Sequence, residues 1–335
     1  MIPILHRLRA AAAGLLLAAG LATLAAAPAA AQSVNPTASA VKEEQLLQEL
    51  QKAQGRVSIP DAKSGTLIQP QGREWRAFHE ETLPKVAGAA ILGGLALCVL
   101  FYLVRGKIRI DSGRSDRTIT RFGGFERFVH WLTASSFLVL ALSGLNVTFG
   151  KHLLLPIVGP QGFHIVSEMA KTAHNYLSFP FALGVVLMLL IWIKDNIPNG
   201  TDLGWFAKGG GILSKGHPPA GRFNGGQKVI FWTVVLGGGA IAASGYMLMF
   251  PFYVTDMAGM QLSQMVHGIL AGVVTAVIIG HIYIGSVGME GAFDAMGSGE
   301  VDLNWAREHH SLWVEEITRK DPTIVHPGGR MAPAE

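Results

Sequence analysis

The sequence predicts an all-α integral membrane protein in which a four-helix transmembrane bundle follows one additional transmembrane helix. Half of the 335 residues are hydrophobic and 15% are charged, whereas a soluble domain carries about 25% charged residues. Uncharged apolar runs of about 20 residues recur along the chain, and each is long enough to cross the hydrocarbon core as a helix. The hydrophobic content excludes a disordered chain, and a net charge of +4 argues against a nucleic-acid-binding protein.

The first 31 residues have the pattern of a secretory signal peptide. Arg7 and Arg9 precede an apolar stretch, and small residues lead to a cleavage point after Ala31. We therefore expect the next segment, residues 32–85, to be a periplasmic arm. It contains a short amphipathic helix followed by a polar stretch with Gly and Pro, which suits either a solvated tether or a docking arm for a partner protein.

Five apolar runs follow the arm and define the membrane-spanning helices. The first run is the additional helix (86–104), and the other four form the predicted bundle (128–288). The five runs are Val86–Val104, Phe128–Phe149, His174–Ile193, Val229–Phe250 and Met265–Gly288.

Lys and Arg are distributed unevenly among the segments between these runs. Seven lie within residues 105–127, five lie between the third and fourth runs, and none lies in Pro251–Gln264. Since cytoplasmic loops carry the excess of positive charge, we expect the loop 105–127, the loop between the third and fourth runs, and the tail 289–335 to be cytoplasmic. The chain is then a multi-pass protein of the bacterial inner membrane with a periplasmic mature N-terminus.

Four histidines lie within or at the ends of the apolar runs, where an ionisable side chain is costly and therefore a functional candidate. The predicted topology places His130 and His281 in the cytoplasmic half of the bundle, and His174 and His267 in the outer half. His267 and His281 are 14 residues apart on one helix, a rise of about 21 Å that returns to nearly the same face. One such histidine could simply bond a neighbouring helix, but four at matched depths favour a cofactor site.

The pairing indicates two haems that are bound without covalent attachment. Neutral imidazole is the commonest protein metal ligand, and helix bundles hold cofactors between facing side chains. Cys98 is the single cysteine, which excludes a CxxCH haem attachment and an iron–sulfur cluster. We expect His130 and His281 to bind an inner haem and His174 and His267 an outer haem, about 20 Å apart, as an electron path through the bilayer.

Three further residues have weaker reasons to lie near these haems. Gly144 follows His130 by 14 residues on nearly the same face, where a missing side chain would let the macrocycle approach, although ordinary helix packing explains this glycine equally well. Arg127 and Lys171 each precede an expected ligand by three residues. They could meet a haem propionate or be routine positive residues that flank a membrane helix.

The remaining histidines are interpreted as ordinary loop and tail residues. His217 is expected to be solvated, and the adjacent His309 and His310 lack metal-ligand spacing to any cysteine or carboxylate cluster. The sequence assigns no function to them.

Several segments resemble the cytochrome b (gamma) subunit of membrane-bound respiratory formate dehydrogenases. The 14-residue histidine spacing combined with NGGQK is the specific part, and the signal peptide, the arm and the additional helix depart from the compact form of the family. The matching segments are RFVHW (127–131), His174, RFNGGQKVIFW (222–232), MVHGILAGVVTAVIIGHIYIG (265–285) and WAREHHSLWVEEI (305–317).

The resemblance implies the cofactors and partners of that family. It implies two non-covalent haem b groups with the pairing given above, and a quinone site on the cytoplasmic side with Asn224, Gly226, Gln227 and His281 as contacts. Formate would be oxidised in a separate molybdenum- or tungsten-containing catalytic (alpha) subunit, and electrons would arrive through an iron–sulfur (beta) subunit. From the residues alone, Asn224 and Gln227 can either bond a quinone carbonyl or cap the fourth helix.

Three other functions fit part of the pattern. The cytochrome b subunit of a hydrogenase or another molybdoenzyme would use a similar four-histidine bundle. A transporter with intramembrane histidines would bind no haem, and the paired depths argue against it. A purely structural membrane anchor would tolerate replacement of His267.

Overall fold

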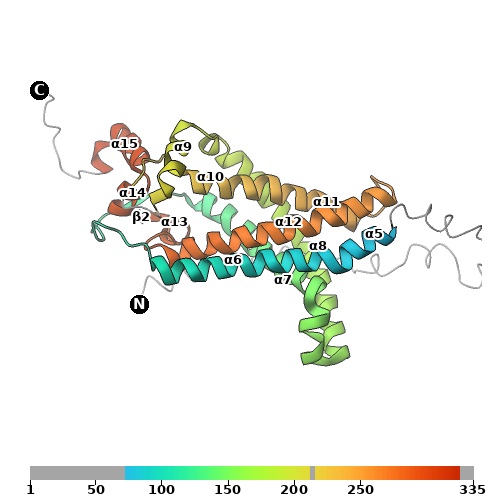
Figure 1. Cartoon of the computed structure of the whole chain (residues 1–335). Helices are drawn as coiled ribbons and strands as arrows, with labels where there is room; N and C mark the ends of the chain where they lie inside the picture. Colours follow the sequence, from blue (N-terminus) through green and yellow to red (C-terminus); the bar gives the residue numbers. More distant parts are fainter. Residues whose placement is uncertain (1–71, 212–215, 325–335) are drawn as a thin grey trace, which may run out of the picture.

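The computed structural model describes residues 72–211 and 216–324, which form a bundle of long helices with shorter elements gathered at one end (Figure 1). Five of these helices are long and apolar enough to cross a membrane, which confirms the predicted all-α membrane class. The expected signal peptide (1–31) and the arm as far as residue 71 lie outside the described residues.

The first membrane helix begins earlier than its apolar run. It consists of α5 (Gly72–Ala77), a π-turn (Phe78–Thr82) and α6 (Leu83–Arg105). Residues 72–85, which the sequence analysis assigns to the arm, are therefore helical. Pro84 accounts for the π-turn, because proline has no N–H to donate and its ring displaces the carbonyl one turn earlier.

The second and third membrane helices, α7 (Gly124–Leu153) and α8 (Leu155–Trp192), also extend beyond their apolar runs. The hydropathy predicts that the third helix opens at His174, but α8 bends at Gly159 (φ 72°) and contains His174 in its interior. Polar residues within 160–173 lower the hydropathy without opposing a helix. The helices α7 and α8 pack against each other as a hairpin, and the tip of the hairpin projects out from the side of the bundle (Figure 1).

The fourth and fifth membrane helices also begin before their apolar runs and contain π-turns. The side chain of Asp256 starts the fifth helix by accepting a hydrogen bond from the backbone N–H of Gly259 (3.0 Å). The segments are α10 (Gly225–Trp232), a π-turn (Thr233–Gly238), α11 (Gly239–Met249), α12 (Met257–Tyr283) and a π-turn (Ile284–Gly288).

Small residues let the additional helix α6 approach α12 closely. A Cβ atom on Gly94 would lie 3.2 Å from the carbonyl oxygen of Ala276, and a Cβ atom on Gly272 would lie 3.1 Å from Cα of Ala87. Both neighbours are backbone atoms, so no side-chain rotation could relieve the contact. Because close packing of small residues is a main source of helix association in lipid, α6 is an integral part of the bundle.

Three polar segments fold together at one end of the bundle (Figure 1). They are residues 106–123, 193–224 without 212–215, and 289–324, and we call them the cap. Within the cap, β1 (Thr118–Thr120) pairs antiparallel with β2 (Glu300–Asp302). The structure thus brings together the same three segments that the charge distribution assigns to one side of the membrane.

Helices and a buried core stabilise the cap. Its main helices are α9 (Gly200–Ala207), α13 (Asp294–Gly297), α14 (Leu303–His309) and α15 (Ser311–Lys320). Burial of apolar surface at the junction between cap and bundle stabilises both. Members of this core include Phe122, Val129, Trp192, Phe231, Trp305 and Trp313.

Replacing Gly94 by Leu is expected to push α6 away from α12 and to lower the free energy of unfolding by about 1–3 kcal/mol. Thermal unfolding of the purified chain in detergent measures this change. The neighbouring substitution Gly93→Leu is the control, because a Cβ on Gly93 meets nothing within 4 Å. Equal unfolding temperatures for the two variants would show that the α6–α12 contact is not close-packed.

Candidate functional site

The four histidines of the membrane helices come together as two pairs. The imidazole ring centres of His174 (α8) and His267 (α12) are 6.1 Å apart, and those of His130 (α7) and His281 (α12) are 6.3 Å apart. We call these the outer pair and the inner pair. Both use α12, where the 14 residues between His267 and His281 separate the pairs by about 21 Å.

Both rings of the outer pair bond a neighbouring helix through Nδ1. His174 Nδ1 lies 2.8 Å from Oγ of Ser143 on α7, and that hydroxyl donates its own proton to the carbonyl of Val139 (2.7 Å). His267 Nδ1 lies 3.0 Å from the Ile241 carbonyl on α11. A carbonyl can only accept, and the serine proton is already used, so both Nδ1 atoms carry hydrogen. Each Nε2 therefore has the lone pair that a metal requires.

A Ser-Gly dipeptide recurs beside each outer histidine. Ser143 and Gly144 lie on α7, and Ser244 and Gly245 lie on α11, where Ser244 Oγ is 3.3 Å from Nδ1 of His267. A Cβ on Gly144 would be 3.6 Å from Cε1 of its histidine, and one on Gly245 would be 3.0 Å from Cε1. Sequence reasoning identified Gly144 but missed the other three residues, although the repeated Ser-Gly in two apolar helices was a visible signal.

The inner pair is held by the cap. His130 makes an edge-to-face contact with Trp131 (ring centres 5.1 Å apart), whose indole N–H donates to the carbonyl of Met296 in the cap (2.8 Å). Within the described part of the chain, the buried Nδ1 of His130 has no hydrogen-bond partner. The two pairs therefore differ, because the outer rings are oriented by hydrogen bonds and the inner ring of α7 by aromatic packing.

The spacing of both pairs suits one metal ion between two imidazoles. A metal–imidazole bond is about 2.0 Å long and the nitrogen lies about 1.1 Å from the ring centre, so two rings on opposite sides of a metal have centres about 6.2 Å apart. The measured 6.1 and 6.3 Å agree with this value. Two protein ligands leave four positions of a six-coordinate iron to a planar macrocycle, and the residues therefore fit haem.

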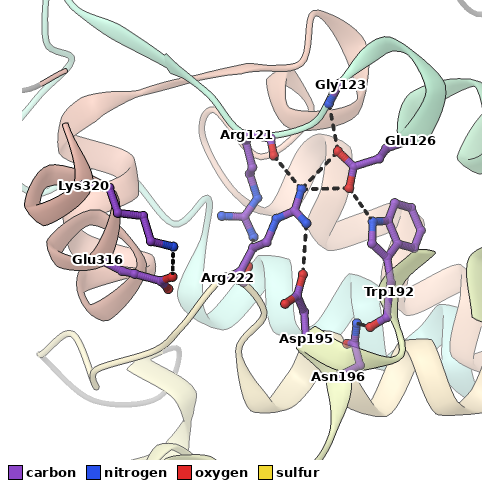
Figure 2. A network of polar contacts seen from close by, with 9 residues as sticks. All are labelled: Arg121, Gly123, Glu126, Trp192, Asp195, Asn196, Arg222, Glu316 and Lys320. Carbon is purple, nitrogen blue, oxygen red and sulfur yellow. Dashed lines mark hydrogen bonds and ion pairs between the residues drawn. The ribbon is translucent and has the colours of Figure 1, made fainter. Parts of the chain in front are cut away.

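Glu126 joins the inner ends of three membrane helices (Figure 2). It lies one turn before His130 on α7, and its carboxylate accepts from the indole of Trp192 at the end of α8 (2.7 Å). It also accepts from the guanidinium of Arg222 just before α10 (2.7 and 3.0 Å), and Arg222 donates to Asp195 as well (3.0 Å). Charge-assisted bonds of this kind are strong, so the network fixes His130 relative to α8 and α10.

Arg121 places a buried positive charge at the same end. Its side chain is 3% exposed, and its Nη2 donates to the carbonyl of Arg222 and to Oε1 of Gln227 (3.4 Å). Burial and the nearby Arg222 lower the pKa of Arg121 to about 9, while Glu126 acts in the opposite direction. Arg121 therefore stays protonated at neutral pH. Three aromatic rings lie within 5.4 Å of its guanidinium carbon: Phe122, Trp305 and Trp313.

The expected quinone contacts Asn224, Gly226 and Gln227 meet at the N-terminus of α10. Asn224 Oδ1 accepts from the backbone N–H of Gln227 (2.9 Å), and Gln227 Oε1 accepts from that of Asn224 (3.1 Å). The two side chains thus satisfy backbone N–H groups at the start of α10 reciprocally, which is one of the two roles that the sequence left open. Each side chain uses its carbonyl oxygen for this bond, so its NH2 group can still donate to an outside acceptor. The fourth expected contact, His281, faces His130.

The two basic residues expected near haem propionates have different surroundings. Nη1 of Arg127 donates to the carbonyl of Gly297 (2.9 Å) and so ties α7 to the cap. Lys171 is exposed, about one turn before His174 on α8.

Replacing Glu126 by Ala is expected to lower the free energy of unfolding by about 2–4 kcal/mol, because it leaves Arg222 partly buried without its main partner. Thermal unfolding of the purified chain tests this. The control is Glu316→Ala, which removes an exposed ion pair with Lys320 (Figure 2) and should change stability by less than about 0.5 kcal/mol. The inference about Glu126 is wrong if the two variants unfold at the same temperature.

Comparison with known proteins identifies the family of this chain. Residues 121–299, more than half of the chain, match the family described as prokaryotic cytochrome b561. The formate dehydrogenase cytochrome b556(fdo) subunit of Escherichia coli (strain K12) is 27% identical over 206 residues, which cover 60% of this chain and 94% of the relative. The nitrate-inducible cytochrome b556(Fdn) subunit of the same strain is 24% identical over 212 residues, covering 62% and 94%.

A third relative extends the comparison to another organism. The formate dehydrogenase cytochrome b556 subunit of Haemophilus influenzae is 25% identical over 217 residues, which cover 63% of this chain and 87% of the relative. These matches confirm the resemblance that the histidine and NGGQK motifs indicate. With a family match across the helices that carry both histidine pairs, the chain belongs to the prokaryotic cytochrome b561 family.

Proposed function

We propose that this chain is the membrane cytochrome b subunit of a formate dehydrogenase and carries electrons across the membrane to a quinone. The observation that carries the proposal is the presence of two histidine pairs with metal-bridging spacing at two levels of one helix. The family match supports b-type haem, and the names of the relatives support formate dehydrogenase as the parent enzyme.

His174 and His267 would hold the outer haem b, and His130 and His281 the inner one. Each bound haem would supply a one-electron iron couple. The protein's own contribution is to present neutral imidazoles with fixed orientation: Ser143 and the carbonyl of Ile241 hold the outer rings through Nδ1. Such bonds also make the coordinating nitrogen more basic.

We assign the cap to the cytoplasm and the loop between α11 and α12 to the periplasm. The excess of Lys and Arg within residues 105–127, and their absence from Pro251–Gln264, support this orientation. The iron–sulfur and the molybdenum or tungsten subunits would then dock at the periplasmic end, near the outer pair. In this division, residues 1–31 are the leader, 32–71 the arm, and 289–335 the cytoplasmic tail.

The quinone site would lie at the N-terminus of α10. The NH2 groups of Asn224 and Gln227 can donate to a quinone carbonyl, and the positive charge of Arg121, bonded to Gln227, favours a carbonyl oxygen that gains electron density. Gly226 lies beside the ring of Trp205, which is 3.0 Å from where a Cβ would stand, and His281 would bring the inner haem to this site. Reduction takes two electrons from the haems and two protons from the cytoplasm to give quinol.

Reduced-minus-oxidised visible spectra with haem quantified per chain test the ligand assignment. We expect two haems in the wild type and one in each of His267→Ala and His281→Ala, because each variant loses one axial ligand. His164→Ala removes an exposed histidine of α8 and should keep both. Formate should reduce both haems in the whole complex, and a folded wild type without haem would refute the proposal.

The hydrogen bond from His174 to Ser143 should tune the outer haem. Ser143→Ala removes the acceptor at Nδ1, makes the imidazole less basic and should raise the midpoint potential of the outer haem by tens of millivolts. Redox titration of the purified chain measures this shift. Ser178→Ala is the matched control, because its hydroxyl donates to the carbonyl of Asn175 on the same helix. A midpoint potential of the outer haem that equals the wild-type value would show that Ser143 has only a packing role.

A further inference from the structure

A group of titratable residues that the bundle does not use connects the surface of the cap with its interior. At the surface, Nε2 of His217 lies 3.1 Å from Oδ2 of Asp111 and 3.9 Å from Oε2 of Glu308. The side chain of Asp111 is 73% exposed and that of His217 is 33% exposed. Glu308 is buried and accepts from the backbone N–H groups of Asp111 and Ser112. This end of the group is open to protons from solvent.

Two buried histidines continue from this surface cluster. The ring centre of His309 lies 5.8 Å from that of His217. Burial and the neighbouring His217 lower the pKa of His309 to about 4; Arg121 lowers it further, and Glu308 and Asp111 raise it. His309 is therefore neutral at physiological pH.

His310 follows directly and is 0% exposed. Its Nδ1 lies 2.8 Å from the carbonyl of Gly221. Since a carbonyl can only accept, Nδ1 carries the hydrogen and Nε2 is an acceptor. Burial, then Arg121, hold the pKa of His310 well below its usual value, His309 acts in the same direction, and the bond to Gly221 opposes them.

Arg121 and His310 contact the same two tryptophan rings, and each has buried nitrogen atoms without a hydrogen-bond partner. The ring of Trp305 lies 5.4 Å from the guanidinium carbon of Arg121 and 5.3 Å from the centre of the His310 ring. Trp313 also faces both. Among the described residues, Nε and Nη1 of Arg121 have no acceptor and Nε2 of His310 has no donor. Leaving such buried groups unpaired is costly, and water between them would satisfy both.

The far end of the group reaches the proposed quinone site. Nη2 of Arg121 donates to Oε1 of Gln227 (3.4 Å), and Gln227 and Asn224 cap each other at the start of α10. Burial, with the positive charge of Arg121 as a further cause, keeps both histidines neutral, so a proton that arrives is passed on and not held.

We propose that Asp111, His217, His309 and His310, with water beside Arg121, form the proton-uptake route for quinone reduction, and this rests on the proposed function above. Protons enter at Asp111 and His217 and move through His309. His310 takes up and releases each proton at Nε2, because its Nδ1–H stays bonded to Gly221. Two protons delivered beside Gln227 combine with two electrons and one quinone to give one quinol.

The test uses the whole complex in lipid vesicles with formate and a water-soluble quinone analogue. His217→Ala is the first variant because His217 is at the surface, and His309→Gln is the second; His164→Ala is the control. We expect both variants to keep two haems that formate reduces at the wild-type rate. Quinone reduction should fall by about tenfold or more at pH 8 and by less at pH 6, where protons are more abundant. Millimolar imidazole should restore it in His217→Ala without affecting the control.

The outcomes separate the two proposals. Quinone reduction within twofold of the wild type in both variants at pH 8 overturns the relay and leaves the proposed function intact. A loss that is equal at both pH values and is not rescued by imidazole also overturns it, because a structural defect behaves in this way. Failure of formate to reduce the haems of the wild type instead removes the proposed function itself.

Discussion

The outer half of the bundle depends on one constraint: an imidazole inside an apolar helix must give its N–H to an acceptor. In this protein the acceptors come from neighbouring helices, Ser143 on α7 for His174 and the Ile241 carbonyl on α11 for His267. Serine can accept because its own proton is taken by the carbonyl of Val139 within its own helix. The same bonds that join α7 to α8 and α11 to α12 therefore fix the rings and leave the lone pair of each Nε2 available to a metal. Under the proposed function, helix pairing and cofactor binding are set by one requirement.

The inner end uses charge where the outer end uses neutral hydrogen bonds. Glu126 is shared by Arg222 and Trp192, and Arg121 remains charged in a cage of aromatic rings. Arg222 is balanced by two carboxylates, Glu126 and Asp195, whereas the buried Arg121 donates to two neutral oxygens, the Arg222 carbonyl and Gln227 Oε1. The charge of Arg121 therefore acts on its immediate surroundings, where it favours a group that gains an electron. Under the proposed function, it would help to make the inner level the more easily reduced of the two, which is the order that electrons moving inward require.

The sequence predicts what is local and periodic. Hydropathy locates five spans, and the 14-residue spacing of His267 and His281 gives the two levels, because both depend on one helix and its rise. Hydropathy does not predict that helices begin at Gly72 and Leu155, because helical turns with polar residues have the same low hydropathy as loops. Arg121 was likewise counted as a loop charge, although it is buried. Its environment is built from aromatic residues far away in the chain, and no local pattern reveals such contacts.

The position of the cap gives the bundle its direction. The histidine pairs are nearly equivalent in geometry, so nothing in the ligands alone distinguishes one end of the path from the other. The difference comes from the surroundings. The outer end of the bundle has only a short loop between α11 and α12, with Phe252, Tyr253 and Val254 exposed, whereas the inner pair lies beside the cap with its buried His310 and Arg121. Under the proposed function, electrons arrive along α12 while protons arrive through the cap, and they meet at Gln227. Because the electrons and the protons come from opposite sides of the membrane, each turnover would separate charge across it. Quinone reduction at the outer pair would not separate charge in this way.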